Sequence, residues 1–274
     1  METPLHPHHT HIISDMPYPV TDFFTPAEFL SAAETGARGE LTMAALETRL
    51  IVAATRHADN LGVGYNDLLC DGNAWVLSRM SIEMERMPRI HDTFSIVTWV
   101  ENFNRHLSER NFSVLDADGL PMGHARSVWA CINIESRRPA SLYLEGDVTS
   151  PRICPIAPQP RMKPVTSPER EVRYRFTYSD IDFNRHVNSA RYVELITNCF
   201  PLRMFDTHRM RRLDIAYLHE APYGSEAIVR IGRENPQSHI YRIDIDDATG
   251  QGDTRCRARV EFIESPSSGF MTRI

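Results

Sequence analysis

The amino-acid sequence predicts an α+β protein with antiparallel sheets, formed by two copies of one unit. The first observation is a repeated order of patterns, because each half of the chain has a strand-like entry, a helix and then several long alternating strands. The second is a proline-rich segment that separates the halves. The third is internal similarity, since residues 79–82 (Arg-Met-Ser-Ile) align with residues 212–215 (Arg-Leu-Asp-Ile). Self-similarity of this kind indicates a duplicated structural unit.

The entry to the first half gives two conflicting signals. Residues 25–28, Thr-Pro-Ala-Glu, match a capping box and suggest a short helix, whereas the duplication requires a strand. We expect the strand. The helix that follows is predicted at 42–60, where one face is apolar and Gly62 marks the end. Alternating strands are then predicted near residues 75–87, 93–102, 107–116 and 124–134.

The second half repeats this order. Residues 171–178 alternate in side-chain type and predict a strand. A helix follows, with Asn188 or Ser189 as its N-cap and Pro201 as its stop. Four further strands are predicted near residues 210–219, 226–234, 240–246 and 255–263.

The proline-rich segment sets the predicted division of the chain. Residues 144–170 contain six prolines, a density that excludes regular structure and is typical of an extended linker. We therefore predict a flexible His- and Pro-rich tail at 1–19, an N-terminal unit at 20–143, a linker at 144–170 and a C-terminal unit at 171–274.

The composition argues against several classes of protein. A net charge of −6 gives no indication of nucleic-acid binding. No apolar run reaches the roughly 20 residues that span a bilayer, and the first residues lack the basic and apolar regions of a secretory signal, so a cytoplasmic protein is expected. The five cysteines are never spaced as C-x-x-C, which argues against a disulfide framework and a zinc site. No metal or cofactor is predicted.

The densest polar chemistry lies in residues 180–188, Asp-Ile-Asp-Phe-Asn-Arg-His-Val-Asn, between the strand and the helix of the second half. The start of a helix presents unpaired backbone N–H groups, which favour an oxygen that is gaining negative charge. This loop is therefore a plausible place to polarise an acyl group. Asp180 and Asn188 are expected to cap the loop and the helix, because Asp and Asn are favoured at such positions.

This loop resembles the Asp-x-Asn-x-His signature of the acyl-ACP thioesterase family, through Asp182, Asn184 and His186. Glu220, in the context Leu-His-Glu-Ala-Pro, takes the place of that family's catalytic Glu on a later strand. Further similarity covers nearly the whole chain, from about Val20 to Glu264, and includes residues 76–80, 92–99, 126–129 and the Arg137–Arg138 pair.

The resemblance implies a double hotdog, in which two tandem antiparallel sheets each wrap a helix. It implies hydrolysis of fatty acyl-acyl carrier protein, with Glu220 as the base for the hydrolytic water and Asn184 with the helix N–H groups as ligands of the thioester carbonyl. Asp182 would orient Asn184 and His186 or share the water. His186 would complete the hydrogen-bond network or protonate the leaving thiolate. The division of labour among these groups stays open.

A single active site in the C-terminal half is predicted, because the matching first-half positions carry other residues. Gly36, Arg38 and Glu40 stand where the second half has Asp182, Asn184 and His186, and Met87 stands at the position of Glu220. The first half is then left to shape an acyl cavity, for which Trp75, Met80, Met84 and Met87 are candidates; plain core packing is the alternative for each. A thiol nucleophile is disfavoured, because Ala221 follows Glu220 where plant relatives carry Cys.

Two other functions stay open: an acyl-CoA thioesterase of the hotdog superfamily, and a non-catalytic acyl-binding protein on the same fold. The expected partner is acyl carrier protein with its phosphopantetheine-linked chain, whose acidic surface requires a basic docking patch. Arg209 and Arg212 are our first choice for that patch among three arginine clusters. Neither nucleic-acid binding nor membrane insertion is expected, and a homodimer is left open.

Overall fold

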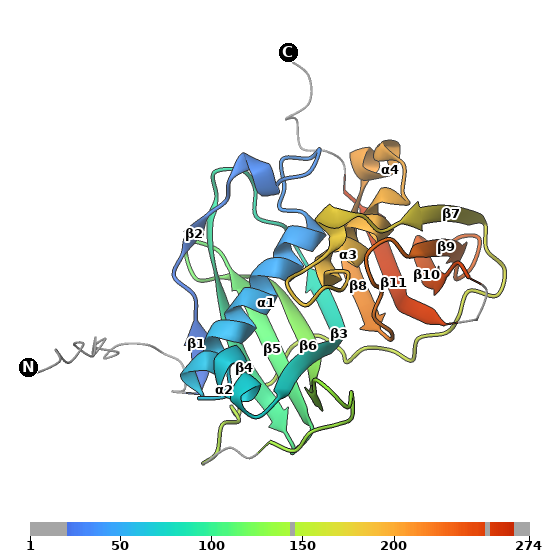
Figure 1. Ribbon diagram of the computed structural model, residues 1–274. Coiled ribbons are helices and arrows are strands. Elements are labelled where there is room, and N and C mark those ends of the chain that lie inside the picture. The colour runs from blue at the N-terminus through green and yellow to red at the C-terminus, as the bar shows by residue number, and fades with distance from the viewer. Residues whose placement is uncertain (1–20, 143–145, 250–252, 266–274) are drawn as a thin grey trace, which may run out of the picture.

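The computed structural model describes residues 21–142, 146–249 and 253–265, which form one continuous antiparallel sheet with helices on one face (Figure 1). The strand order is β1-β4-β5-β6-β3-β8-β11-β10-β9-β7, with β2 paired to β4. The first five strands of this order come from the first half of the chain and the last five from the second half. The predicted α+β class is thereby confirmed. No helix in the described residues is long and apolar enough to cross a membrane.

The first half follows the predicted order of elements. Its entry is extended, as β1 (Asp22–Phe24) and β2 (Glu28–Phe29), so the strand expectation is confirmed over the capping-box signal. A 3₁₀ turn, η1 (Ala32–Glu34), leads to the long helix α1 (Met43–Asn60), which is capped by the Thr42 hydroxyl. The remaining elements are α2 (Tyr65–Cys70), β3 (Asn73–Met84), β4 (Thr93–Phe103), β5 (Leu107–Leu115) and β6 (Pro121–Asn133).

The second half repeats the plan with a shorter helix. Strand β7 (Arg170–Arg175) and the turn η2 (Tyr178–Asp180) lead to α3 (Ser189–Asn198), whose N-cap is Asn188. The short helix α4 (Leu202–Thr207) follows Pro201. The strands are β8 (His208–Tyr217), β9 (Glu226–Arg233), β10 (Ile240–Asp247) and β11 (Thr254–Glu264).

The two halves join through β3 and β8, the strands that the sequence repeat aligns. They pair antiparallel with Ser81 opposite Asp214, and this register is the one expected for two copies related by a local two-fold axis at that pair. The Ser81 hydroxyl donates to Asp214 Oδ1 at 2.8 Å. Asp214 is fully buried and also accepts from the Arg212 guanidinium, which satisfies its charge at the junction. The exact limits of the two units stay a prediction.

Helices α1 and α3 lie on the same face of the sheet and share one hydrophobic core with it. Leu46 and Leu50 of α1 and Val193 and Ile196 of α3 are fully buried there. Burial of such a side chain contributes about 1.5–3 kcal/mol relative to exposure. Met80 is also fully buried in this core, as are Met84 and the inward residues of the central strands.

The proline-rich segment contacts the opposite face of the sheet. Its described residues 146–169 contain no helix and no strand longer than an isolated bridge, as its composition predicts. Cys154 and Ile156 pack with Trp99 in a second, smaller core on this face. Gln159 donates to the carbonyl groups of Met80 and Ile215, at the junction of β3 and β8. The segment therefore joins the two halves of the sheet on the face opposite the helices.

Candidate active site

The polar loop of the second half is held by Asp180, as its position predicts. The Asp180 carboxylate accepts from the backbone N–H of Thr177 at 2.7 Å and from the hydroxyl of Tyr174 at 3.1 Å. Asp180 is buried, and its carbonyl accepts from the N–H of Asn188. Asn188 in turn caps α3, since its side-chain oxygen accepts from the N–H of Ala190 at 2.9 Å. The loop thus has a fixed beginning and a fixed end.

Asp182 folds the loop between these two points. Its Oδ1 accepts from the backbone N–H groups of Asn184 at 2.8 Å and His186 at 3.4 Å, and its own N–H donates to the carbonyl of His186. Arg185 stands within this turn at a φ of 68°, the left-handed region. At the matching first-half position Gly39 has a φ of 66°. Asp182 therefore contacts Asn184 and His186 through their backbone N–H groups, and orients both residues in this way.

The segment that follows β8 in the chain, residues 220–222, lies beside the loop. The N–H of Val187 donates to the carbonyl of Ala221 at 2.9 Å, and His186 and Pro222 form an antiparallel bridge. As a result, Nε2 of His186 lies 3.4 Å from Oε2 of Glu220. The two predicted site residues, 34 positions apart in the chain, are thus brought together at a half-exposed edge of the molecule.

Two arginines that the sequence analysis did not assign to the site also contact Glu220. Arg137 pairs with Oε1 of its carboxylate, and Arg255 donates to its carbonyl at 2.7 Å. Arg137 lies in the turn that follows β6, in the first half, so the site draws on both halves of the molecule. The Arg137–Arg138 pair carried part of the family resemblance, and this is the one signal that pointed to it.

Asn184 is the member of the predicted set whose side chain stands apart. Asn184 is exposed. Its backbone N–H donates to Asp182, but among the described residues no hydrogen bond involves its side-chain amide group. The amide is therefore free to bind a ligand next to His186 and the start of α3.

The equivalent loop of the first half has a structural role. Arg38, which corresponds to Asn184, donates to the carbonyl groups of Phe205 at 2.8 Å and Ser265 at 2.9 Å, and pairs with Glu40. These contacts tie the first half to α4 and to the end of β11. Met87, at the position of Glu220, packs against the core. The first-half loop thus has structural contacts where the second-half loop has the predicted site residues.

The buried thiols are poorly placed to act as nucleophiles. Ala221, the residue after Glu220, is almost fully buried and carries no thiol. Cys199 lies at the far end of α3, where its thiol donates to the carbonyl of Leu195, and burial raises its pKa to about 11. Burial likewise raises the pKa of the Cys256 thiol far above its usual value.

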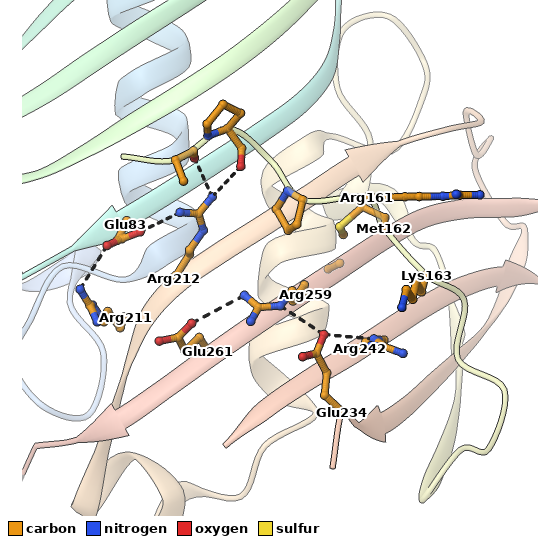
Figure 2. Close-up of a pocket in the computed structure, with 14 residues that line it drawn as sticks. Glu83, Arg161, Met162, Lys163, Arg211, Arg212, Glu234, Arg242, Arg259 and Glu261 are labelled. Carbon is orange, nitrogen blue, oxygen red and sulfur yellow. Dashed lines mark hydrogen bonds and ion pairs between the residues drawn. The ribbon is translucent and has the colours of Figure 1, made fainter. Parts of the chain in front are cut away.

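A pocket of about 540 Å³ lies on the other face of the sheet, beneath the proline-rich segment, and contains none of the four predicted site residues. Figure 2 shows its charged walls, in which Arg212 pairs with Glu83 and also donates to the carbonyl groups of Ala157 and Pro158. Arg259 pairs with both Glu234 and Glu261. The ion pairs join the strands to one another, and the hydrogen bonds of Arg212 hold the proline-rich segment against them.

Comparisons with known proteins identify the family of the chain. Residues 28–148 match the family model for the acyl-ACP thioesterase N-terminal domain, and residues 164–264 match the model for the C-terminal domain. The chain is 26% identical over 255 residues to a palmitoyl-acyl carrier protein thioesterase, chloroplastic, from Gossypium hirsutum. It is 26% identical over 209 residues to an oleoyl-acyl carrier protein thioesterase from Arabidopsis thaliana. These matches cover 82% and 68% of this chain but only 62% and 56% of the relatives' lengths.

Solved structures extend the similarity to the whole fold. The crystal structure of an acyl-ACP thioesterase from Bacteroides thetaiotaomicron superimposes with a TM-score of 0.81 at 34% identity, over 89% of this chain and 98% of that one. The 12:0-ACP thioesterase from Umbellularia californica has the same fold at 18% identity, with a TM-score of 0.74 over 89% of this chain and 98% of that one. The double hotdog expectation is confirmed. The chain belongs to the acyl-ACP thioesterase family.

Proposed function

We propose that this protein hydrolyses the thioester of fatty acyl-acyl carrier protein and releases a free fatty acid and the carrier thiol. The observation that carries this proposal is the Glu220 carboxylate, 3.4 Å from Nε2 of His186 and next to the loop that opens α3. A carboxylate base beside a helix start provides both a proton acceptor for water and donors for an oxyanion.

Each predicted residue has a role that fits its contacts. Glu220 takes a proton from water as the water oxygen attacks the thioester carbon. The amide of Asn184 and the N–H groups at the start of α3 stabilise the resulting oxyanion. When the carbon–sulfur bond breaks, the thiolate takes a proton from His186 or from Glu220. Asp182 positions the backbone that carries Asn184 and His186.

A direct assay separates the proposal from its two alternatives. The protein is incubated with acyl-acyl carrier proteins and the matching acyl-CoAs, and released fatty acids are identified by mass spectrometry. Release from the carrier protein at higher kcat/KM supports the proposal. Equal or greater efficiency on acyl-CoA would favour the acyl-CoA thioesterase, and binding without release would favour the acyl-binding protein. The cytoplasmic location stays a prediction, and a homodimer stays open.

The docking patch chosen from the sequence is wrong. Arg212 is only 7% exposed and is tied to Glu83 and Asp214 within the molecule. Arg209 is partly buried and donates to the carbonyl of Met84. Neither is placed to meet an acidic partner.

Arg138 and Arg185 replace them as the proposed contacts with the carrier. Both are exposed, Arg138 next to Arg137 in the turn and Arg185 on the Asp182 loop, and no ion pair involves either of them among the described residues. They therefore lie beside the site with their charges available.

Reversing these charges is expected to weaken carrier binding. Arg138→Glu with Arg185→Glu should raise KM for acyl-acyl carrier protein roughly tenfold and reduce its dependence on salt, because the lost attraction is electrostatic. Hydrolysis of a small neutral thioester, acyl-N-acetylcysteamine, should fall far less. Steady-state kinetics at low and high ionic strength measures both effects. An equal loss on both substrates would indicate a disturbed loop and would reject the docking role.

Arg137→Gln is expected to lower kcat about tenfold with little change in stability. Its ion pair with Glu220 is about half exposed, so it adds little to folding, but it holds the carboxylate at the site. Arg191→Gln is a matched control, because Arg191 pairs with Glu194 on α3 at similar exposure. Kinetics and thermal unfolding are compared for both variants. Equal activity of the two variants would contradict a positioning role for Arg137.

Cys199→Ser is expected to remain active. The serine hydroxyl can donate to the carbonyl of Leu195 as the thiol does, and the buried thiol is not ionised at neutral pH. The measurement is the rate of acyl-acyl carrier protein hydrolysis, with circular dichroism as the check on folding. A folded but inactive variant would indicate that the Cys199 thiol acts as a nucleophile.

A further inference from the structure

A polar cluster lies inside the core where the two halves meet, next to the polar loop of the second half. It consists of Glu47 on α1, Tyr217 at the end of β8 and Tyr192 on α3. The Tyr217 hydroxyl donates to Oε1 of Glu47 and lies 3.5 Å from the carbonyl of Ser189, the first residue of α3. The rings of Tyr192 and Tyr217 are in contact, with centroids 6.0 Å apart. Glu47 is fully buried and Tyr192 is 3% exposed.

Two polar atoms of this cluster have no hydrogen-bond partner in the described part of the chain: Oε2 of Glu47 and the hydroxyl of Tyr192. A buried polar atom left unsatisfied costs about 1–3 kcal/mol, and buried polar groups in folded proteins nearly always have partners. Glu47 and Tyr192 both contact Tyr217, so a ligand oxygen bound beside Tyr217 would lie in the same polar cluster as both unsatisfied atoms.

The cluster is not required by the fold. The loop-to-helix segments of the two halves correspond position by position, and Val193 of α3 matches Glu47 of α1. Val193 is fully buried without any polar group, so an apolar residue suits this position in the same packing. Glu47 thus introduces a carboxyl group where the other half has none.

The cluster also lies close to the predicted site along the chain. Tyr217 precedes Glu220 by three residues, and Ser189, whose carbonyl it approaches, follows His186 by three. An acyl chain whose thioester lies at the loop and whose tail enters the core beside Tyr217 would bring its first carbons to this cluster. Both unsatisfied atoms are closed to solvent, so a polar group would have to be carried to them by the apolar chain.

We propose that Glu47 and Tyr192 form a specificity site for an oxygen substituent, a hydroxyl or oxo group, on the acyl chain close to the thioester. Tyr192 donates to the substituent oxygen, and the Glu47 carboxyl group accepts from a hydroxyl or, when protonated, donates to an oxo group. Burial raises the pKa of Glu47 to about 7, so both forms are present near neutral pH. The proposal rests on the proposed thioesterase function.

The test compares saturated, 3-hydroxy and 3-oxo acyl-acyl carrier proteins of equal chain length. The wild type is expected to show at least about tenfold higher kcat/KM for an oxygenated substrate, since a buried pair is then satisfied. Tyr192→Phe and Glu47→Leu should each collapse this ratio toward one. Tyr241→Phe is the control, because this buried tyrosine packs on Phe200 and Phe262 beyond the other end of α3. Its ratio should equal that of the wild type.

The outcomes separate the inference from the proposed function. If saturated acyl-acyl carrier protein is hydrolysed and the ratio of kcat/KM between oxygenated and saturated substrates is one, the specificity site is rejected and the thioesterase function stands. A raised ratio that is unchanged in both Tyr192→Phe and Glu47→Leu gives the same conclusion. If both substitutions lower kcat/KM equally for all three substrates, the cluster acts on the pantetheine arm that they share, and the inference is rejected. If no thioester is hydrolysed, calorimetric titration with free 3-hydroxy and unsubstituted fatty acids decides the site, and equal affinity of the two acids would reject it.

Discussion

Glu220→Gln is expected to lower the rate of acyl-acyl carrier protein hydrolysis by about a hundredfold or more. Glutamine keeps the shape of the side chain but cannot take a proton from water, and a positioned base contributes roughly 10²–10⁴-fold to such a reaction. The ion pair with Arg137 is lost and the contact with His186 is changed, but the Glu220 side chain is 40% exposed, so stability should change little. Single-turnover kinetics and thermal unfolding measure the two effects.

Glu194→Gln is the matched control, because Glu194 is 46% exposed and pairs with Arg191 on α3, in the same half of the chain. It should hydrolyse the substrate at the wild-type rate. If Glu220→Gln also retained near-wild-type turnover, Glu220 would not be the base, and Asp182 would be the remaining carboxylate among the four predicted residues.

Much of the fold follows from local patterns in the sequence. The predicted helix at 42–60 forms as Met43–Asn60, because the apolar face and Gly62 both agree, and the structure adds Thr42 as its N-cap. The eight long strands lie within a few residues of their predicted limits, since alternation of apolar and polar side chains marks the two faces of a sheet. The pairing of β3 with β8 across the junction was not predicted, because it joins strands from the two halves of the chain.

The site was only partly predictable, because its remaining contacts join distant parts of the chain. Asp182, Asn184 and His186 are close in sequence, and Glu220 was added through the family resemblance. The contact of Arg137 with Glu220 spans 83 residues and that of Tyr217 with Glu47 spans 170. No local pattern carries such pairings. For the same reason the burial of Arg212 was missed, since its partners Glu83 and Ala157 come from the other half and from the proline-rich segment.

Glu47→Gln is expected to make the protein more stable at alkaline pH. Burial raises the pKa of Glu47 from 4.5 to about 7, although the Tyr217 hydrogen bond acts in the opposite direction. Between these two values the folded protein binds a proton that the unfolded chain has released, so wild-type stability falls as pH rises. The total loss is about 3 kcal/mol, nearly complete above pH ~8.

Glutamine cannot ionise and can still accept from Tyr217, so the variant should lack this loss. Urea unfolding at about pH 5 and pH 8.5 measures it as a difference in the free energy of unfolding between variant and wild type that grows with pH. Glu194→Gln should follow the wild type at both values, because its carboxylate is exposed. If Glu47→Gln showed the pH dependence of the wild type, the Glu47 carboxyl group would not titrate in the range that its burial implies. It would then not be present in both its protonated and its ionised form near neutral pH, and it could not both donate and accept at the specificity site.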